Sequence, residues 1–256
     1  PLLLSTWLGT VTREGDPAMK FVATGDWQLG MTAHFLDDEA RPRFQQARFD
    51  AVQRIADVVT EHDAQFVVVC GDVFESNQLD RRVTARAFEA LRAIEVPVVL
   101  VPGNHDPLDA ASIYDSRRFV DAKPDHVQVL RSSEPYEVLP GVEVIGAPWS
   151  SKRPQRDLMT AAVEGREPAP DGVVRILAGH GAVTTLSPDP DDPAVVDVAD
   201  LQRALADGVV HAAVLGDRHS TTEVADRIWY PGAPEVTSRD EVDPGNVLVM
   251  DVAPDR

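Results

Sequence analysis

The sequence predicts a layered α/β domain, and three observations support this fold class. Short apolar runs rich in β-branched residues recur along the chain, as is typical of strands covered on both faces. Helical stretches separate these runs, and alternating strands and helices are typical of α/β layers. Five of the runs are followed within two residues by glycine and then a polar residue. An open α/β sheet binds its ligands at such strand ends.

Each expected element follows from its own local pattern. The expected strands are residues 21–24, 66–70, 98–101, 142–145, 174–178, 209–215 and 247–252. Between the first two strands, apolar residues from Phe44 to Val59 recur at steps of three and four, which predicts an amphipathic helix. The proline-rich residues 167–172 and 187–193 are predicted to be loops.

The domain organisation follows from length and hydrophobic content. A chain of 256 residues with 43% hydrophobic residues can bury one sizeable core, so we expect one globular domain. Met19 has the position of a natural start, and residues 1–18 are therefore interpreted as an extension outside the fold. The domain then covers residues 19–256.

Charge and cysteine content limit the partners and the location. The chain has 24 Lys and Arg against 42 Asp and Glu, a formal net charge of −18. A nucleic acid would therefore need a local basic patch or bound metal to approach this surface. The lone Cys70 excludes an intrachain disulfide framework and fits a reducing, cytoplasmic location. No apolar run approaches the roughly 20 residues that cross a bilayer, so no membrane span is expected.

Basic residues occur in small groups, and each group taken alone resembles an ordinary solvated face. If two or three groups border one site, they form the positive patch that a phosphate backbone needs. The groups are Arg41, Arg43 and Arg48; Arg81, Arg82 and Arg86; Arg117 and Arg118; and Lys152, Arg153 and Arg156.

The polar residues after the strands have the chemistry of a metal site. They are aspartate, asparagine and histidine without cysteine, which suits Mn²⁺, Fe²⁺ or Zn²⁺, with Mg²⁺ also open. Glycine beside them lets the backbone turn sharply and approach an ion. Five loops with one or two ligands each would hold two ions, which clamp the attacking and leaving oxygens of a phosphoester.

Five ordered motifs resemble those of calcineurin-like metallophosphoesterases. They are Gly25-Asp26-Trp27-Gln28-Leu29-Gly30, Gly71-Asp72-Val73-Phe74-Glu75, Gly103-Asn104-His105-Asp106, Gly179-His180 and Gly216-Asp217-Arg218-His219. Within that superfamily, the first two are similar to those of SbcD-type DNA exonucleases. The resemblance covers about residues 19–251. It implies two mixed β-sheets packed face to face and flanked by helices.

The resemblance also implies a set of metal ligands. Asp26 and His219 would bind the first ion, and Asp72 would bridge both ions. Asn104 and His180 would bind the second ion. Each assignment carries a ligand role of the family to the matching position of a motif in this sequence.

Four further residues receive roles near the substrate. His105 would give a proton to the leaving oxygen, a task that suits the near-neutral pKa of imidazole. Asp106 would orient either His105 or its loop. Trp27 would either stack on a base or wall the site, and both interpretations stay open. His34 follows the first metal loop and could reach substrate.

The chain departs from the family pattern at two positions. Gln28 and Asp217 stand where the family usually has histidine, and each would supply one ligand to one ion. Their oxygen donors are harder than imidazole, so we expect a preference for Mn²⁺ or Mg²⁺, with Mn²⁺ first.

The resemblance implies a Mn²⁺-dependent DNA exonuclease or endonuclease that acts in double-strand-break repair. Its partners would be DNA and an SbcC-type coiled-coil ATPase, and a homodimer is open. Such nucleases usually carry a capping domain after the catalytic domain. Here the chain stops at Arg256, immediately after the last expected strand, so we expect either a naturally minimal enzyme or a truncated catalytic domain. The alternatives are a phosphodiesterase or phosphatase for small nucleotides, and a catalytically impaired scaffold that binds DNA ends.

Overall fold

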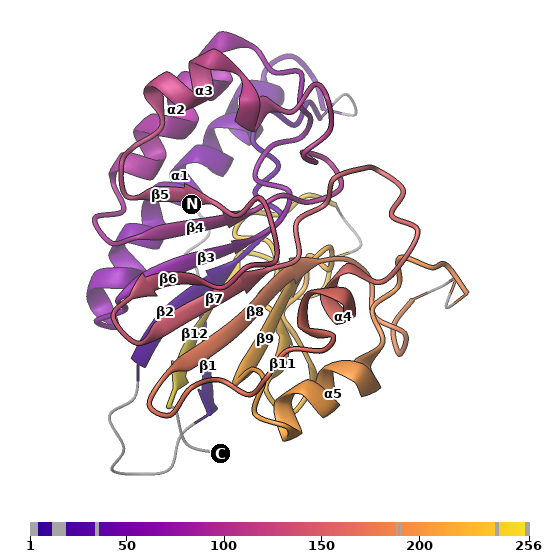
Figure 1. The fold of residues 1–256 in the computed structure, drawn as a ribbon. Coiled ribbons are helices and arrows are strands. Elements are labelled where there is room, and N and C mark those ends of the chain that lie inside the picture. Colours follow the sequence, from indigo (N-terminus) through magenta and orange to yellow (C-terminus); the bar gives the residue numbers. More distant parts are fainter. Residues whose placement is uncertain are drawn as a thin grey trace.

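Two six-stranded sheets pack face to face between layers of helices in the computed structural model of the protein (Figure 1). The structure describes residues 5–11, 19–33, 36–187, 189, 191–238 and 241–253, and for residues 5–11 it describes the backbone alone. Within these residues, no helix is long and apolar enough to cross a membrane. The layered α/β fold predicted from the sequence is confirmed.

The first sheet has the strand order β1-β12-β2-β3-β4-β5. Its strands are β1 (Ser5–Val11), β12 (Asn246–Val252), β2 (Met19–Thr24), β3 (Phe66–Cys70), β4 (Val98–Val101) and β5 (Val127–Val129). Strands β2 to β5 are parallel, whereas β12 is antiparallel to β2. The carboxyl ends of β2, β3 and β4 therefore meet at one edge of this sheet.

The second sheet has the order β10-β11-β9-β8-β7-β6. Its strands are β10 (Thr222–Ala225), β11 (Ile228–Tyr230), β9 (Ala212–Gly216), β8 (Val174–His180), β7 (Val142–Gly146) and β6 (Tyr136–Leu139). Strands β7, β8, β9 and β11 are parallel, and antiparallel strands flank them at both edges. The sheet is therefore mixed, like the first.

Three apolar cores separate the layers. Helices α1 (Ala40–Glu61), α2 (Arg81–Arg92) and α3 (Arg117–Ala122), with the 3₁₀ turn Ile113–Asp115, cover the outer face of the first sheet. Helices α4 (Leu158–Val163) and α5 (Val198–Ala206) cover the outer face of the second. Strand β3 shows why both faces are apolar. Val67 and Val69 pack toward the helices, while Phe66, Val68 and Cys70 pack between the sheets.

The predicted bounds agree closely with the observed bounds for the buried strands, whereas several short strands are not predicted. Strands β3 and β4 have the predicted bounds, and α1 contains the predicted amphipathic stretch. Strand β9 begins at Ala212, so the predicted start at residue 209 is wrong. The sequence pattern does not predict β5, β6, β10 and β11, because three or four partly polar residues give too little periodicity to detect.

The interpretation of the chain's start needs correction. Residues 1–18 are not all outside the fold, because Ser5–Val11 forms strand β1 and pairs in parallel with β12. No local pattern indicates this pairing, since it depends on a strand more than 200 residues later.

Candidate metal centre

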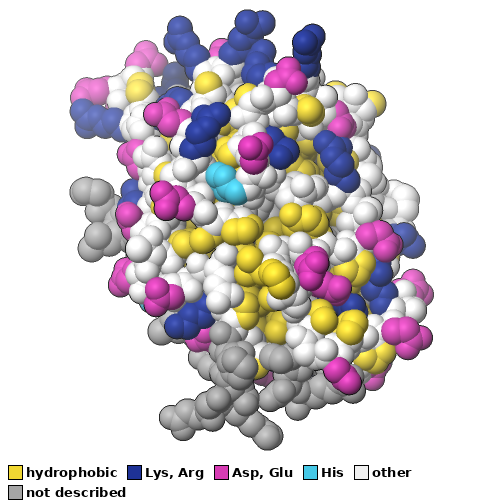
Figure 2. All heavy atoms as spheres, turned by 60° about the vertical axis from the view of Figure 1, so that its left-hand side comes forward, with side chains coloured by type: hydrophobic (Ala, Val, Ile, Leu, Met, Phe, Trp, Pro, Cys, Tyr) yellow, Lys and Arg dark blue, Asp and Glu magenta, His cyan; other side chains and the backbone are white. Residues whose placement is uncertain are grey.

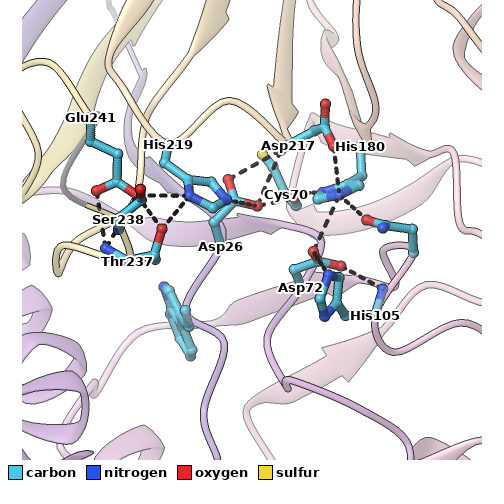
Figure 3. A network of polar contacts seen from close by, with 12 residues as sticks. Asp26, Cys70, Asp72, His105, His180, Asp217, His219, Thr237, Ser238 and Glu241 are labelled. Atoms are coloured by element: carbon cyan, nitrogen blue, oxygen red, sulfur yellow. Dashed lines mark hydrogen bonds and ion pairs between the residues drawn. The ribbon is translucent and has the colours of Figure 1, made fainter. Parts of the chain in front are cut away.

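The carboxyl ends of five strands from both sheets converge on one site (Figure 3). Loops after β2, β3 and β4 bring residues from the first sheet, and the end of β8 and the loop after β9 bring residues from the second. His180 connects the two sheets, because its Nδ1 lies 3.0 Å from the carbonyl oxygen of Cys70. The convergence predicted from the sequence therefore holds for all five motifs.

Asp26, Asp72 and His180 form the centre of the site, and all three are buried. One ligand atom from each lies within 4.8 Å of the other two. The Nε2 of His180 is 3.5 Å from Oδ2 of Asp72, and its Nδ1 is 3.9 Å from Oδ1 of Asp26. Donors on opposite sides of a bound transition-metal ion are separated by about 4 Å, so these residues can surround a cation.

Asn104 and Asp217 point toward the same histidine. Oδ1 of Asn104 lies 2.7 Å from Nε2 of His180, and Oδ1 of Asp217 lies 3.8 Å from that nitrogen. The backbone N–H of Asp217 also donates to both carboxylate oxygens of Asp26, at 3.2 and 3.1 Å. The structure thus places two more predicted ligands next to the buried centre.

His219 reaches the centre from the other side and is held by residues that the sequence did not reveal. Its Nε2 is 3.7 Å from Oδ1 of Asp26. Its Nδ1 lies 2.9 Å from Oε1 of Glu241 and also contacts the hydroxyl of Thr237. Such contacts fix the orientation of a ligating imidazole. Figure 3 shows His219, Thr237 and Glu241 on one side of Asp26 and the His180 group on the other.

His105 stands beside this centre at its accessible side. Its backbone N–H donates to Oδ1 of Asp72 over 2.9 Å, and its Nε2 is 3.9 Å from Oδ2 of the same carboxylate. Its Nδ1 faces the carbonyl oxygen of Glu75 at 3.0 Å. The side chain is 37% exposed. This placement suits a residue that meets substrate directly.

Asp106 holds the loop of residues 103–106 in place. None of its described hydrogen bonds reaches the His105 ring. Its carboxylate is buried and accepts from the N–H groups of Gly103 and Phe74 and from the hydroxyl of Tyr114. Burial, with the nearby Asp72, raises the pKa of Asp106 to about 6. Of its two predicted roles, orientation of the loop is the one these contacts support.

Three other predicted residues have different outcomes. Trp27 is 1% exposed, and its indole N–H donates to Thr24. Its ring is therefore enclosed in the core, where a base cannot stack on it, and its role as a wall of the site stays a prediction. His34 lies outside the described residues. Gln28 is buried with a φ of 43°, and its N–H donates to the carbonyl of Asp72. In the described part of the chain, no hydrogen bond joins the Gln28 side chain to the centre.

The centre carries charge that a cation would balance. Burial, opposed by His180 and His219, raises the pKa of Asp26 to about 7. Burial also disfavours a charged His180, but Asp72, Asp26 and Asp217 outweigh this and raise its pKa to about 9. Buried oxygen and imidazole donors that face one another in this way fit a divalent metal ion.

Glycines allow this crowding. A Cβ on Gly216 would lie 1.8 Å from the carbonyl oxygen of Cys70 and 2.7 Å from Nδ1 of His180. A Cβ on Gly103 would lie 2.2 Å from Oδ1 of Asp72. Only hydrogen fits at these positions, because the neighbouring groups are backbone and buried site residues.

Gly216→Ala should therefore destabilise the fold and disturb the site together. Overpacking of a filled interior costs about 1–3 kcal/mol, and here the clash falls on the backbone beneath His180. Urea unfolding and metal titration should both show a loss. Gly165→Ala is the control, because a Cβ there meets nothing within 4 Å and only its φ of 70° is unfavourable. Equal metal binding in wild type and Gly216→Ala would contradict the prediction.

The layered fold and this buried group of carboxylates and histidines define a metal-dependent phosphoesterase. The sequence model of the calcineurin-like phosphoesterases matches residues 19–220. The chain belongs to this family, whose members use divalent metals. A comparison with curated proteins gives no match.

Three solved structures are similar to this chain. TT1561 of Thermus thermophilus has 12% sequence identity and a TM-score of 0.50, with 84% of this chain and 90% of that chain covered. GAP50, the anchor in the inner membrane complex of Plasmodium, has 12% identity and a TM-score of 0.51, with 89% and 75% covered. A dimetal phosphatase from Danio rerio has 14% identity and a TM-score of 0.48, with 84% and 87% covered. At these identities the likeness to the first two concerns the fold alone.

The two departures from the family pattern lead to a prediction on metal preference. The double variant Gln28→His with Asp217→His should bind Zn²⁺ more tightly relative to Mn²⁺ than wild type does, because imidazole is softer than amide or carboxylate oxygen. Isothermal titration with both ions measures this, with hydrolysis assays alongside. The single variants separate the positions, since Asp217 faces His180 and no described hydrogen bond joins the Gln28 side chain to the centre. An unchanged metal preference in the double variant would show that neither residue is a ligand.

Proposed function

We propose that this phosphoesterase hydrolyses phosphodiester bonds of the DNA backbone with two divalent ions, preferably Mn²⁺. The observation that carries the proposal is the buried triad Asp26, Asp72 and His180 with His105 beside it, half-exposed and 3.9 Å from Asp72. A substrate phosphate that enters from the open side meets His105 and the metal-ligating groups together. This is the arrangement that phosphodiester hydrolysis needs.

Each group has a defined task in this proposal. Asp26, Gln28 and His219 would hold the first ion, Asn104, His180 and Asp217 would hold the second, and Asp72 would contribute to both. When bound, such ions supply a nucleophile at neutral pH and neutralise phosphate charge.

His105 would give a proton to the leaving oxygen. The Glu75 carbonyl accepts a hydrogen bond from Nδ1–H, so a ring protonated on both nitrogens would present its second N–H, at Nε2, to the leaving oxygen. Asp72 accepts the His105 backbone N–H and so ties the proton donor to the bridging ligand.

A local basic surface supports DNA as the substrate despite the net charge of −18. Helix α2 carries four arginines and one glutamate, and α3 carries two arginines and one aspartate. Figure 2 shows Lys and Arg side chains gathered over the end of the molecule that these helices form in Figure 1. The start of α2 lies near the first metal loop, because a Cβ on Gly30 would contact Leu79 and Val83. A phosphate backbone bound there would lead toward the centre.

The wider role follows from the resemblance to SbcD-type nucleases. In this proposal the protein acts in the cytoplasm in double-strand-break repair, with an SbcC-type coiled-coil ATPase as partner. It works either as one copy or as a homodimer. Co-purification with such an ATPase and the mass of the complex in solution would test these statements.

Cleavage assays separate this function from its alternatives. Linear DNA, supercoiled DNA and a small nucleotide diester are each incubated with the protein and Mn²⁺, and an EDTA-treated sample serves as the control. We expect hydrolysis of DNA that disappears with EDTA. Turnover of the small diester alone would favour a nucleotide phosphodiesterase, which the acidic surface would tolerate. DNA binding without cleavage would identify a scaffold.

A further inference from the structure

Arg48 is a buried cation beneath the metal centre, although its sequence context suggests a solvated face. The residue lies in α1 and is 2% exposed. Its guanidinium is 4.6 Å from the ring centroid of Phe44, a cation–π distance. A buried charge is costly unless its hydrogen bonds are satisfied, so its partners indicate what it does there.

The guanidinium of Arg48 joins two loops that both end at the site. Its Nη1 donates to the carbonyl of Trp27 over 3.2 Å. Its Nη2 donates to the carbonyl of Val236 over 2.9 Å and also contacts the sulfur of Met31. Arg48 and Val236 are 188 residues apart in the sequence. One side chain thus binds the first metal loop to the segment that follows β11.

Both carbonyls that Arg48 contacts belong to residues whose chain neighbours form part of the site. Trp27 stands between Asp26 and Gln28, whose φ angles are 53° and 43°. Two non-glycine residues with positive φ persist only where surrounding contacts hold them. Val236 directly precedes Thr237, and Thr237 with Glu241 contacts Nδ1 of His219.

Carboxylates that contact His219 and His105 also act on the charge of Arg48. Burial lowers the pKa of Arg48 to about 10, against the attraction of Glu235, Glu241 and Glu75. Glu241 contacts His219, and Oε2 of Glu75 is 3.8 Å from Nδ1 of His105. Arg48 therefore stays a cation at neutral pH, and both of these carboxylates act on it.

We propose that Arg48 is the positioning residue for the first-ion half of the site, in which Asp26 and His219 face each other. By fixing the carbonyls of Trp27 and Val236, it holds the two loops at the separation at which these ligands face one another, 3.7 Å between Oδ1 and Nε2. The expected effect of Arg48 on metal binding rests on the proposed two-metal function. The contacts of Arg48 with the two loops do not depend on that function.

The test uses Arg48→Lys and Arg48→Met, with Arg43→Lys as the matched control. Lysine keeps the charge but lacks the planar fork that reaches two carbonyls at once. Arg43 lies on the same helix and pairs with the exposed Glu39, with no described bond to Trp27 or Val236. Arg48→Lys decides the outcome if Arg48→Met does not fold.

Two measurements are made on each variant. In titration with Mn²⁺, Arg48→Lys should bind one of two ions about 10–100-fold more weakly and the other as wild type does, which is the usual effect of losing a group behind the ligands. In metal-free protein, amide hydrogen exchange should rise in residues 26–31 and 232–238 and stay unchanged in residues 103–106. Arg43→Lys should match wild type in both.

The outcomes distinguish this proposal from the function it rests on. Wild-type affinity for both ions in Arg48→Lys overturns the proposal, as does an equal rise in exchange in both halves of the site. If wild type itself binds no ion, the two-metal function is wrong, and the exchange measurement alone then decides the role of Arg48.

Discussion

Asp72→Ala should reduce phosphodiester hydrolysis to the level of the metal-free protein, because the proposed function assigns this carboxylate to both ions. In the structure, Oδ2 of Asp72 is 3.5 Å from His180 and 3.9 Å from His105, so its loss would disturb both the proposed ligand of the second ion and the proposed proton donor. Metal content by mass spectrometry, measured beside the rate with Mn²⁺, checks the prediction. Both should fall in the same variant.

Asp72→Asn separates the effect of the lost charge from an effect on folding. The amide oxygen can still accept the His105 backbone N–H, so the loop should keep its position while the negative charge is lost. A similar unfolding midpoint in wild type and Asp72→Asn, with loss of metal and activity in the variant, would separate metal binding from folding. Activity that persists in wild type after EDTA treatment would show that hydrolysis needs no metal and would refute the prediction.

His105→Asn should keep its metals and lose about 10²–10⁴-fold in turnover, the usual contribution of a general acid. Its ring is 37% exposed at the open side, whereas the predicted ligands Asp26 and His180 are buried. The measurement is kcat beside metal stoichiometry. A substrate whose leaving group needs no proton should recover much of the lost rate in this variant.

His126→Asn is the control for this loss. His126 precedes β5 and so lies at the amino ends of the parallel strands, opposite to the site, where its Nε2 lies 3.1 Å from the Leu91 carbonyl. Its turnover should equal that of wild type. If His105→Asn loses its metal, His105 is a ligand and its assignment as proton donor is wrong.

Local pattern is enough to predict a layered α/β domain and the sheet edge at which the polar loops meet. Strands buried on both faces are continuously apolar, so β3 and β4 are predicted with their observed bounds. The glycine and polar residues after such strands share one edge of a parallel sheet, so Asp26 and Asp72 are expected to meet. These predictions need only the period of a strand and the direction of the chain.

Other features are decided by contacts between distant segments. The sequence does not show that Glu241 and Thr237 hold His219, because their loop follows no long apolar strand. Nor does it decide that Trp27 is buried and closed to a base, or that β1 adds to the first sheet. Each of these features depends on contacts between segments that lie far apart in the sequence.

Arg48 shows this division between sequence and structure most directly. Helical periodicity alone predicts an amphipathic helix with an arginine among its polar residues, and polar residues of such a helix usually face water. Only the packing of α1 against the first metal loop and residue 236 encloses that arginine and supplies carbonyl partners for its charge. The physical reason is that helix periodicity is set by neighbours four residues away, whereas the burial of a charge is set by which distant groups can satisfy it.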